Sequence, residues 1–178
     1  GGVLRSSDHG ATWLPSAPLI VGALGVDSSG MLFVGPTSTD SFSAYGVLYR
    51  SSDRGATLNP MTAGVMADVA GITHVLCAGG GVMLVGGDGV YRSLDGGASF
   101  LHLTSRWLTV PRRSSTLCTR ANGTIFSATT AYGVSRSTDF GATWTKANGA
   151  GASRIGSMHV TTVMVEPGTQ ALYAATGT

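Results

Sequence analysis

The feature that most constrains the fold is an eight-residue phrase that occurs four times along the chain. It reads Ser-x-Asp-x-Gly-x-Thr/Ser followed by an aromatic residue or leucine, and its copies occupy residues 6–13, 51–58, 93–100 and 137–144. The aspartates of successive copies are 45, 42 and 44 residues apart. A four-stranded blade of a β-propeller has this length. The sequence therefore predicts an all-β propeller chain built from four repeats of about 44 residues.

Each copy of the phrase predicts a tight turn between two strands, called here the repeated turn. An aspartate two residues before a glycine can fold its carboxylate back onto backbone N–H groups, and the glycine can adopt a positive φ that other residues resist. Four copies around one molecule cannot all belong to one active site. We therefore predict a structural role for eight residues: Asp8, Gly10, Asp53, Gly55, Asp95, Gly97, Asp139 and Gly141.

The segments between the repeated turns predict four antiparallel strands per blade. First strands are expected at residues 20–26, 73–77, 115–119 and 160–165, and second strands at residues 31–35, 82–86, 124–128 and 171–175. A third strand precedes each repeated turn and a fourth follows it. The first of these fourth strands is expected at residues 11–14, stopped by Pro15. Such short apolar strands are expected to be buried on both faces between neighbouring blades.

The two ends of the chain are expected to complement each other. Residues 1–14 read as a third and a fourth strand, and residues 160–175 read as a first and a second strand, so together they make one blade. Residues 1–178 are thus one propeller domain or a four-blade segment of a larger array. A four-bladed ring, two chains that exchange ends, and a longer tandem array all satisfy this pattern. We expect the half-blades to pair between chains or with further repeats of the same chain, because uncovered strand edges aggregate.

The phrase, with the Arg-Ser pair that opens every copy, resembles the Asp-box, or bacterial neuraminidase repeat. This repeat is found in β-propellers such as sialidases, sortilin-type receptors, xyloglucan-cleaving glycosidases and a photosystem II assembly factor. The resemblance extends over the whole chain. It implies that the repeated turns join third to fourth strands, on the face away from the ligand site. It implies the fold more firmly than any activity, since one fold carries many functions.

Composition narrows the class of protein. The chain is 43% hydrophobic but only 11% charged, with a net charge of +2 and a single lysine and a single glutamate, Lys146 and Glu166. Its arginines are spread over the repeats, so no nucleic-acid partner is expected. No apolar run approaches the about 18 residues of a membrane helix. A surface of Gly, Ser, Thr and Ala favours an extracellular or cell-surface location.

Cysteine and histidine give no sign of a metal or a cofactor. Cys77 and Cys118 occupy matching places in successive repeats, where the distance between blades is too great for a disulfide. We expect two small buried thiols. The four histidines show no ligand spacing, so neither a metal nor another cofactor is expected.

The acidic residues decide whether the chain is predicted to be an enzyme. A glycosidase needs two carboxylates about 5.5 Å or roughly 6.5–9.5 Å apart. Glu166 lies on the side of the repeated turns, which leaves Asp40, Asp68 and Asp88 on the opposite face. Asp88 reads as a hairpin-turn residue, so the alternative catalytic residues are Asp68, which has apolar neighbours, and Asp40. The sequence favours a non-catalytic module, and a glycoside hydrolase completed by additional blades is the alternative.

The most distinctive polar cluster lies in one connection between blades. Arg106 and Trp107 are followed by Arg112 and Arg113. Guanidinium groups beside an indole suit carboxylates, sulfates and sugar faces. We therefore predict an exported structural, assembly or binding module that takes glycans or other anionic ligands through these four residues.

Overall fold

The computed structural model describes residues 2–17, 20–36, 47–62, 71–87, 89–103, 114–129, 133–147 and 159–177. This part of the chain forms three four-stranded and two two-stranded antiparallel sheets. No helix in these ranges is long and apolar enough to cross a membrane. The strands are β1 (Val3–Arg5), β2 (Leu14–Ala17), β3 (Val21–Val26), β4 (Leu32–Pro36), β5 (Tyr49–Ser51), β6 (Asn59–Pro60), β7 (His74–Gly79), β8 (Val82–Gly86), β9 (Val90–Ser93), β10 (Leu101–Leu103), β11 (Ser114–Thr119), β12 (Ile125–Thr129), β13 (Gly133–Ser137), β14 (Thr145–Lys146), β15 (His159–Val165) and β16 (Leu172–Gly177).

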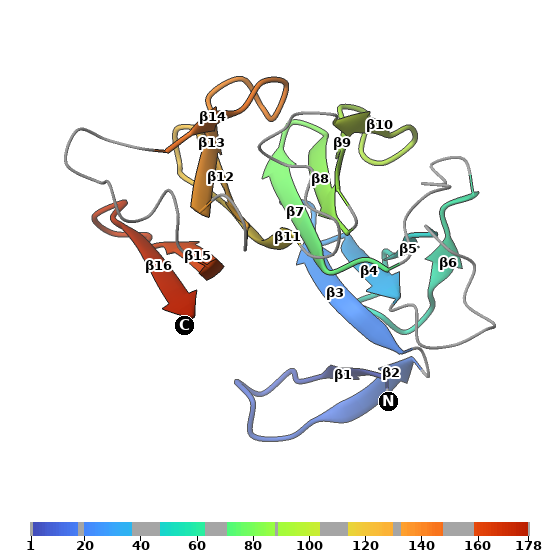
Figure 1. The fold of residues 1–178 in the computed structure, drawn as a ribbon. Helices are drawn as coiled ribbons and strands as arrows, with labels where there is room; N and C mark the ends of the chain where they lie inside the picture. Colours follow the sequence, from blue (N-terminus) through green and yellow to red (C-terminus); the bar gives the residue numbers. More distant parts are fainter. Residues whose placement is uncertain are drawn as a thin grey trace.

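The sheets follow one another around an open arc (Figure 1). Each four-stranded sheet is a meander in sequence order, for example β7, β8, β9 and β10. The first strands of neighbouring sheets touch: β3 contacts β7, β7 contacts β11, and β11 contacts β15. The β1–β2 hairpin lies at one end of the arc and the β15–β16 hairpin at the other. The two hairpins remain separate sheets, so the arc is not closed.

Apolar side chains fill the space between neighbouring sheets. Val85 and Leu84 are adjacent in β8 and both fully buried, but they point to opposite faces because side chains alternate along a strand. Val85 packs with Phe33 of the preceding sheet, whereas Leu84 packs with Ile125 of the following one. A third cluster joins the sheet of β11 to β14 with β15. The core is therefore divided into layers between successive sheets.

The repeated turn has the same hydrogen bonds in all four copies. In the fourth copy, the Ser137 hydroxyl donates to Asp139 Oδ1 over 2.7 Å and accepts the Gly141 N–H over 2.8 Å. The Thr143 N–H donates to Asp139 Oδ1 over 2.9 Å. The same three bonds occur in the first, second and third copies. The serine and the aspartate thus satisfy two backbone donors of each turn.

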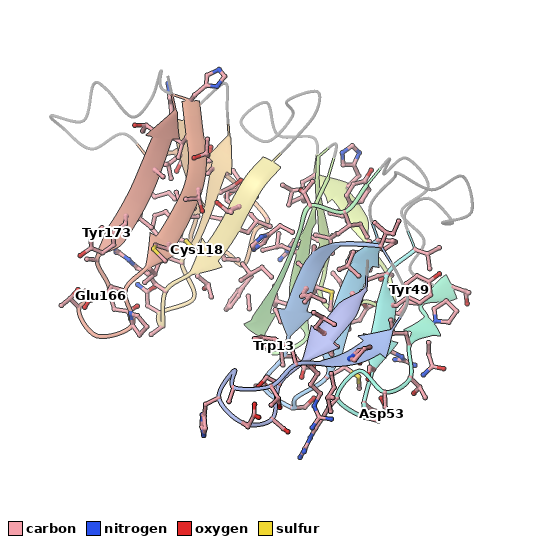
Figure 2. All side chains as sticks on the ribbon, turned by 90° about the horizontal axis from the view of Figure 1, so that it is seen from below. Trp13, Tyr49, Asp53, Cys118, Glu166 and Tyr173 are labelled. Atoms are coloured by element: carbon pink, nitrogen blue, oxygen red, sulfur yellow. The ribbon has the colours of Figure 1, made fainter. Side chains whose placement is uncertain are left out.

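The repeated turns lie at the same end of the sheets as the turns between first and second strands. This follows from the meander, in which alternate turns fall at one end. The Gly96 N–H donates to the Gly81 carbonyl over 2.9 Å, which ties the third repeated turn to the β7–β8 turn. Figure 2 shows Asp53 and Glu166, from two such turns, at the lower edge of their sheets.

The strand that follows the first repeated turn differs from the prediction. It was expected at residues 11–14 with Pro15 as its end, but β2 begins at Leu14 and runs through Pro15 to Ala17. Residues up to Trp13 are used by the turn, because the Trp13 indole donates to the Gly10 carbonyl over 3.1 Å. Pro15 pairs with Leu4 next to a register shift in β1. A proline is tolerated at such an irregular place in an edge strand.

The second strand of the last repeat, β16, also differs from the prediction. Short second strands were expected to be buried on both faces, and β8 is buried along its whole length. In β16, however, only Leu172 is half-buried and the five residues after it are exposed. The reason is that, within the described ranges, β16 pairs with β15 alone and no following sheet covers it.

Candidate functional site

The residues predicted to carry chemistry divide into two groups. The candidate acids Asp40, Asp68 and Asp88 lie outside the described residues. The predicted ligand-binding residues also lie outside them: Arg106, Trp107, Arg112 and Arg113. Glu166 is described, in the turn between β15 and β16, where it accepts a hydrogen bond from the Thr169 hydroxyl. Most of the carboxylates that the structure describes therefore belong to the repeated turns.

The aspartates of the repeated turns are held in their ionised form. The Thr12 hydroxyl and N–H and the Ser6 hydroxyl lower the pKa of Asp8 to about 2. The Ser99 and Ser93 hydroxyls likewise lower the pKa of Asp95 to about 2. Such carboxylates hold no proton at neutral pH. They lock the turn and do not act as general acids.

Asp139 and Asp53 follow the same rule. Burial works against ionisation of Asp139, yet the hydrogen bonds from Thr143 and Ser137 hold its pKa at about 2. Hydrogen bonds from the Ser51 and Thr57 hydroxyls lower the pKa of Asp53. All four aspartates are thus occupied by their own turns.

The thiols and imidazoles of the described ranges form no metal site. No group of three metal-binding side chains occurs there. Cys77 and Cys118 are free and half-buried, and burial raises the pKa of each thiol to about 11. At neutral pH both are protonated, which makes them poor nucleophiles and poor metal ligands.

The arrangement that stands out is a pair of open sheet edges, β1 and β16. Among the strands that the structure describes, both hydrogen-bond on one side only, β1 to β2 and β16 to β15. In the complete sheets, the equivalent strands pair with each other as second and third strands, for example β8 with β9. Each hairpin therefore has half of the strands that a complete sheet has.

The register of the complete sheets identifies which residues of β1 and β16 correspond. Leu172 opposes Val165 across its hairpin as Leu32 opposes Val26, so Leu172 is the equivalent of Leu32. Leu32 in turn opposes Ser51, the serine of a repeated turn. The serine in the same place in the first copy is Ser6. The complete sheets thus map Leu172 onto Ser6, Tyr173 onto Arg5 and Ala174 onto Leu4.

The same hairpins expose large apolar side chains. Trp13 is 59% exposed and Leu14 is 67% exposed at one end of the arc. At the other end Met164 and Tyr173 are 61% and 57% exposed. The equivalent of Trp13 in the fourth copy, Trp144, is 5% exposed. At the complete blades, Trp144 and Leu84, the equivalents of Trp13 and Tyr173, are buried, whereas both places are exposed at the two ends.

Comparison with known proteins gives the fold. No family model matches the chain, and no curated protein matches it. Three solved structures are similar over 99% of the chain. The GH74 enzyme of Niastella koreensis has a TM-score of 0.71 at 18% identity, and the GH74 xyloglucanase of Xanthomonas campestris has a TM-score of 0.69 at 16% identity. YCF48 bound to D1 peptide has a TM-score of 0.66 at 13% identity.

These neighbours are β-propellers. The chain has a β-propeller-like fold. It spans 30% and 31% of the two GH74 chains and 57% of the YCF48 chain, less than two thirds of each. At such identities the likeness concerns the propeller fold and not an activity. In propeller terms, the three four-stranded sheets are blades, and the two hairpins are each half of one.

Proposed function

We propose that this chain is a structural and binding module: an exported propeller unit of four Asp-box repeats that assembles through its two half-blades. The observation that carries the proposal is the register that the complete blades give to β1 and β16. Within the described ranges, β16 is a second strand with one open edge and β1 is a third strand with one open edge. The register of the complete blades matches the residues of one strand to those of the other. We infer that they pair as Leu172 with Ser6, Tyr173 with Arg5 and Ala174 with Leu4.

The backbone direction of these strands supports that pairing. The Gly86 carbonyl accepts the Thr73 N–H, so Gly86 faces the first strand of its blade. Because successive residues of a strand face opposite sides, Val85 faces β9. Ala174 is the equivalent of Val85, and its N–H and carbonyl therefore point to the open side of β16. Pairing with Leu4 would satisfy both groups.

The apolar surface supports it as well. Each large side chain that becomes fully buried contributes about 1.5–3 kcal/mol. Pairing would bring Trp13 under a neighbouring blade, as Trp144 already is. An uncovered apolar edge would otherwise recruit strands without specificity. The strand with matching register is the occupant that these observations favour.

We assign the pairing to two copies of the chain. Figure 1 places the two hairpins at opposite ends of the arc, with three complete blades between them. A second copy can offer its β1 to β16, and its own β16 to the first β1. The contact is then reciprocal and closed, which is the common form of homodimer.

Engineered cysteines test the pairing and its register. Residues next to a hydrogen-bonded pair are not hydrogen-bonded and lie closer, with Cα atoms about 4.5 Å apart, which suits a disulfide. Arg5→Cys with Tyr173→Cys, in a chain whose Cys77 and Cys118 are replaced by serine, should oxidise to a covalent dimer. Arg5→Cys with Ala171→Cys is out of register and serves as the control. Equal oxidation of both pairs, or a disulfide within single chains only, contradicts the proposal.

The binding part of the proposal keeps the predicted anion or glycan surface of Arg106, Trp107, Arg112 and Arg113. Propellers of this fold take different ligands: YCF48 is described with a bound D1 peptide, and the GH74 proteins are enzymes. Loss of retention on a glycan array by Arg112→Ala with Trp107→Ala, with an unchanged melting temperature, supports this surface. Unchanged retention removes it.

The enzyme neighbours favour one alternative, a glycoside hydrolase that additional blades complete and that works through Asp68 and Asp40. It is tested by xyloglucan hydrolysis with the assembled ring. Activity that Asp68→Asn abolishes would establish the alternative. Activity that survives both Asp68→Asn and Asp40→Asn, or no activity at all, rejects it.

A further inference from the structure

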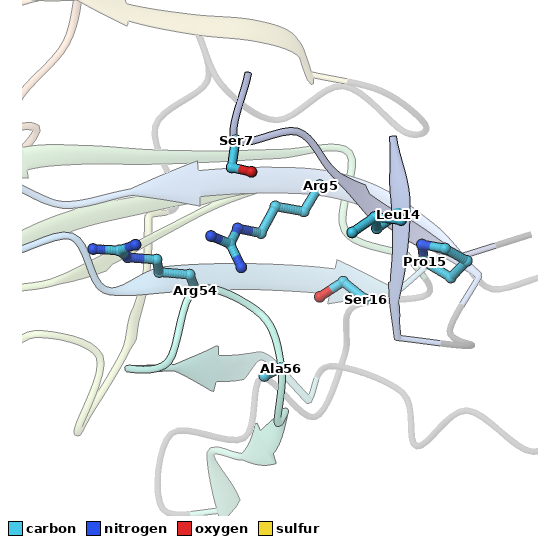
Figure 3. Close-up of a pocket in the computed structure, with 7 residues that line it drawn as sticks. All are labelled: Arg5, Ser7, Leu14, Pro15, Ser16, Arg54 and Ala56. Carbon is cyan, nitrogen blue, oxygen red and sulfur yellow. The ribbon is translucent and has the colours of Figure 1, made fainter. Parts of the chain in front are cut away.

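A pocket of about 320 Å³ lies between the β1–β2 hairpin and the second repeated turn (Figure 3). The pairing of half-blades proposed above gives this pocket no role. Its lining comes from both hairpin strands and from the turn: Arg5, Ser7, Leu14, Pro15, Ser16, Arg54 and Ala56. None of these residues carries a negative charge.

The two walls of the pocket are held together by a direct contact. The Ser16 hydroxyl of β2 donates to the Gly55 carbonyl of the turn. A Cβ at Gly55 would come within 2.5 Å of the Ser16 Oγ, so only glycine permits this approach. Gly55 also has a φ of 89°, which favours glycine. The pocket is therefore a fixed feature of the junction between the hairpin and the next blade.

Two arginines face this pocket from its two walls. Figure 3 shows that the side chains of Arg5 and Arg54 start from different elements and that their guanidinium groups end on the same side of the pocket. Both residues are exposed. The nearby carboxylates Asp8 and Asp53 are occupied by hydrogen bonds within their own turns. Neither arginine has an ion pair or a hydrogen bond within the described ranges.

The equivalent arginine at another junction behaves differently. Arg92 occupies the place of Arg5 in its blade, and its Nε donates to the Phe140 carbonyl of the next repeated turn over 2.6 Å. Phe140 occupies the place of Arg54, directly after the aspartate. At the junction with the third repeated turn that place is taken by Gly96. Within the described junctions, only the first brings two guanidinium groups to one pocket.

Arg54 is also an unfavourable residue for its backbone. Its φ is 61°, in the left-handed region that glycine adopts most easily. Gly96 stands at the same place of the third turn with a φ of 68°. His9 and Phe140 stand at the same place of the first and fourth turns with φ angles of 58° and 55°, so this backbone conformation belongs to the repeated turn, and the guanidinium group is what distinguishes Arg54.

We propose that this pocket binds a compact oxyanion, the carboxylate or sulfate group of an acidic sugar. Guanidinium groups bind planar or tetrahedral oxyanions through paired N–H donors. The volume is at the lower limit of small-ligand pockets, which suits a single sugar unit. The Ser7 hydroxyl can contact sugar hydroxyls, while Leu14 and Pro15 offer an apolar wall to the sugar ring.

Arg54→Gly is the decisive variant. It removes one guanidinium group but inserts the residue that the third turn already uses, so the melting temperature should stay the same or rise. Calorimetric titration of the full chain with galacturonate and with galactose 6-sulfate at low salt should show binding that weakens as salt increases. Arg54→Gly and Arg5→Gln should each weaken it by about tenfold or more, because each removes charge-assisted hydrogen bonds. The tighter of the two sugars identifies the oxyanion.

Arg136→Gln is the matched control, because Arg136 is an exposed arginine at the third-strand place of another blade. It should leave the affinity unchanged. Three results overturn the proposal: no binding of either sugar, wild-type affinity in Arg54→Gly, or an equal loss in all three arginine variants. Arg54 has no place in the strand pairing proposed above, so its titration result is independent of the assembly test.

Discussion

Trp13 and Trp144 make the same hydrogen bond in the same repeated turn, but only Trp144 is buried. Their indole N–H groups donate to the Gly10 and Gly141 carbonyls over 3.1 and 3.0 Å. Trp144 then packs against Leu84 and Leu103 of the preceding blade, whereas Trp13 is 59% exposed. The turn thus forms from local contacts alone. Its aromatic residue is buried only where a preceding blade is present.

The two tryptophans should therefore respond differently to truncation. Trp144→Ala should lower the free energy of unfolding by about 3–5 kcal/mol at any protein concentration, because it empties a core position. Trp13→Ala should change the unfolding of the isolated chain by less than about 1 kcal/mol and weaken the assembly instead. Chemical denaturation at several protein concentrations separates the two effects. A large loss for Trp13→Ala that is independent of concentration would contradict this account.

The buried serine of the repeated turn should matter more than its neighbour. Ser137→Ala removes the acceptor of the Gly141 N–H, which is left unsatisfied in a buried position. We expect a loss of about 1–3 kcal/mol in the free energy of unfolding. Thr138→Ala, at an exposed position in the same turn, should stay within about 0.5 kcal/mol of the parent. Thermal and urea melts of the two variants check the difference.

The glycine of the repeated turn should be needed for contact between blades as well as for the turn. A Cβ at Gly141 would come within 2.9 Å of the buried Leu84 side chain, but a Cβ at Gly30 would touch nothing within 4 Å. Their φ angles are 82° and 84°, so alanine costs the same backbone energy, about 1–2 kcal/mol, at both. Gly141→Ala should lose a further about 1–3 kcal/mol through overpacking. Equal melting temperatures of the two variants would show that the neighbouring blade does not restrict the side chain at position 141.

Acid should destabilise the fold in two pH ranges. Burial lowers the pKa of His74 below 6.5, so this residue contributes stability above pH 6.5 that declines as the pH falls below that value. Hydrogen bonds lower the pKa of Asp8 and Asp95 from 3.8 to about 2, so their contribution is complete above 3.8 and is lost as the pH falls toward 2. Melting temperatures between pH 8 and pH 2 should show both declines. His74→Gln should abolish the first and keep the second.

The sequence predicted those parts of the fold that depend on short-range contacts. Ser137, Asp139 and Gly141 lie within four residues of one another, so their turn could be recognised from their spacing alone. The start of β2 could not be recognised, because it depends on a hydrogen bond from Trp13 that prolongs the turn. The exposure of β16 depends on which strands lie beside it in space, and strand composition does not encode this.

The candidate sites were less predictable. Three arginines and one tryptophan close together in one connection predicted a binding surface in residues 106–113, which lie outside the described residues. The pair Arg5 and Arg54 was missed because the two residues lie 49 positions apart and meet only through the contact of Ser16 with Gly55. A signal was present: when the four copies are aligned, Arg54 is the only arginine directly after the aspartate.

The mass of the native particle tests the central claim most directly. Ala174→Pro removes an N–H that points to the open side of β16 and is not used within the β15–β16 hairpin, whereas Ala174→Ser keeps it. Light scattering should give twice the chain mass of 18.0 kDa for the parent and for Ala174→Ser, and a single chain mass for Ala174→Pro. A parent chain of single mass, with Arg5→Cys and Tyr173→Cys joined within one molecule, would contradict the exchange of half-blades between two copies.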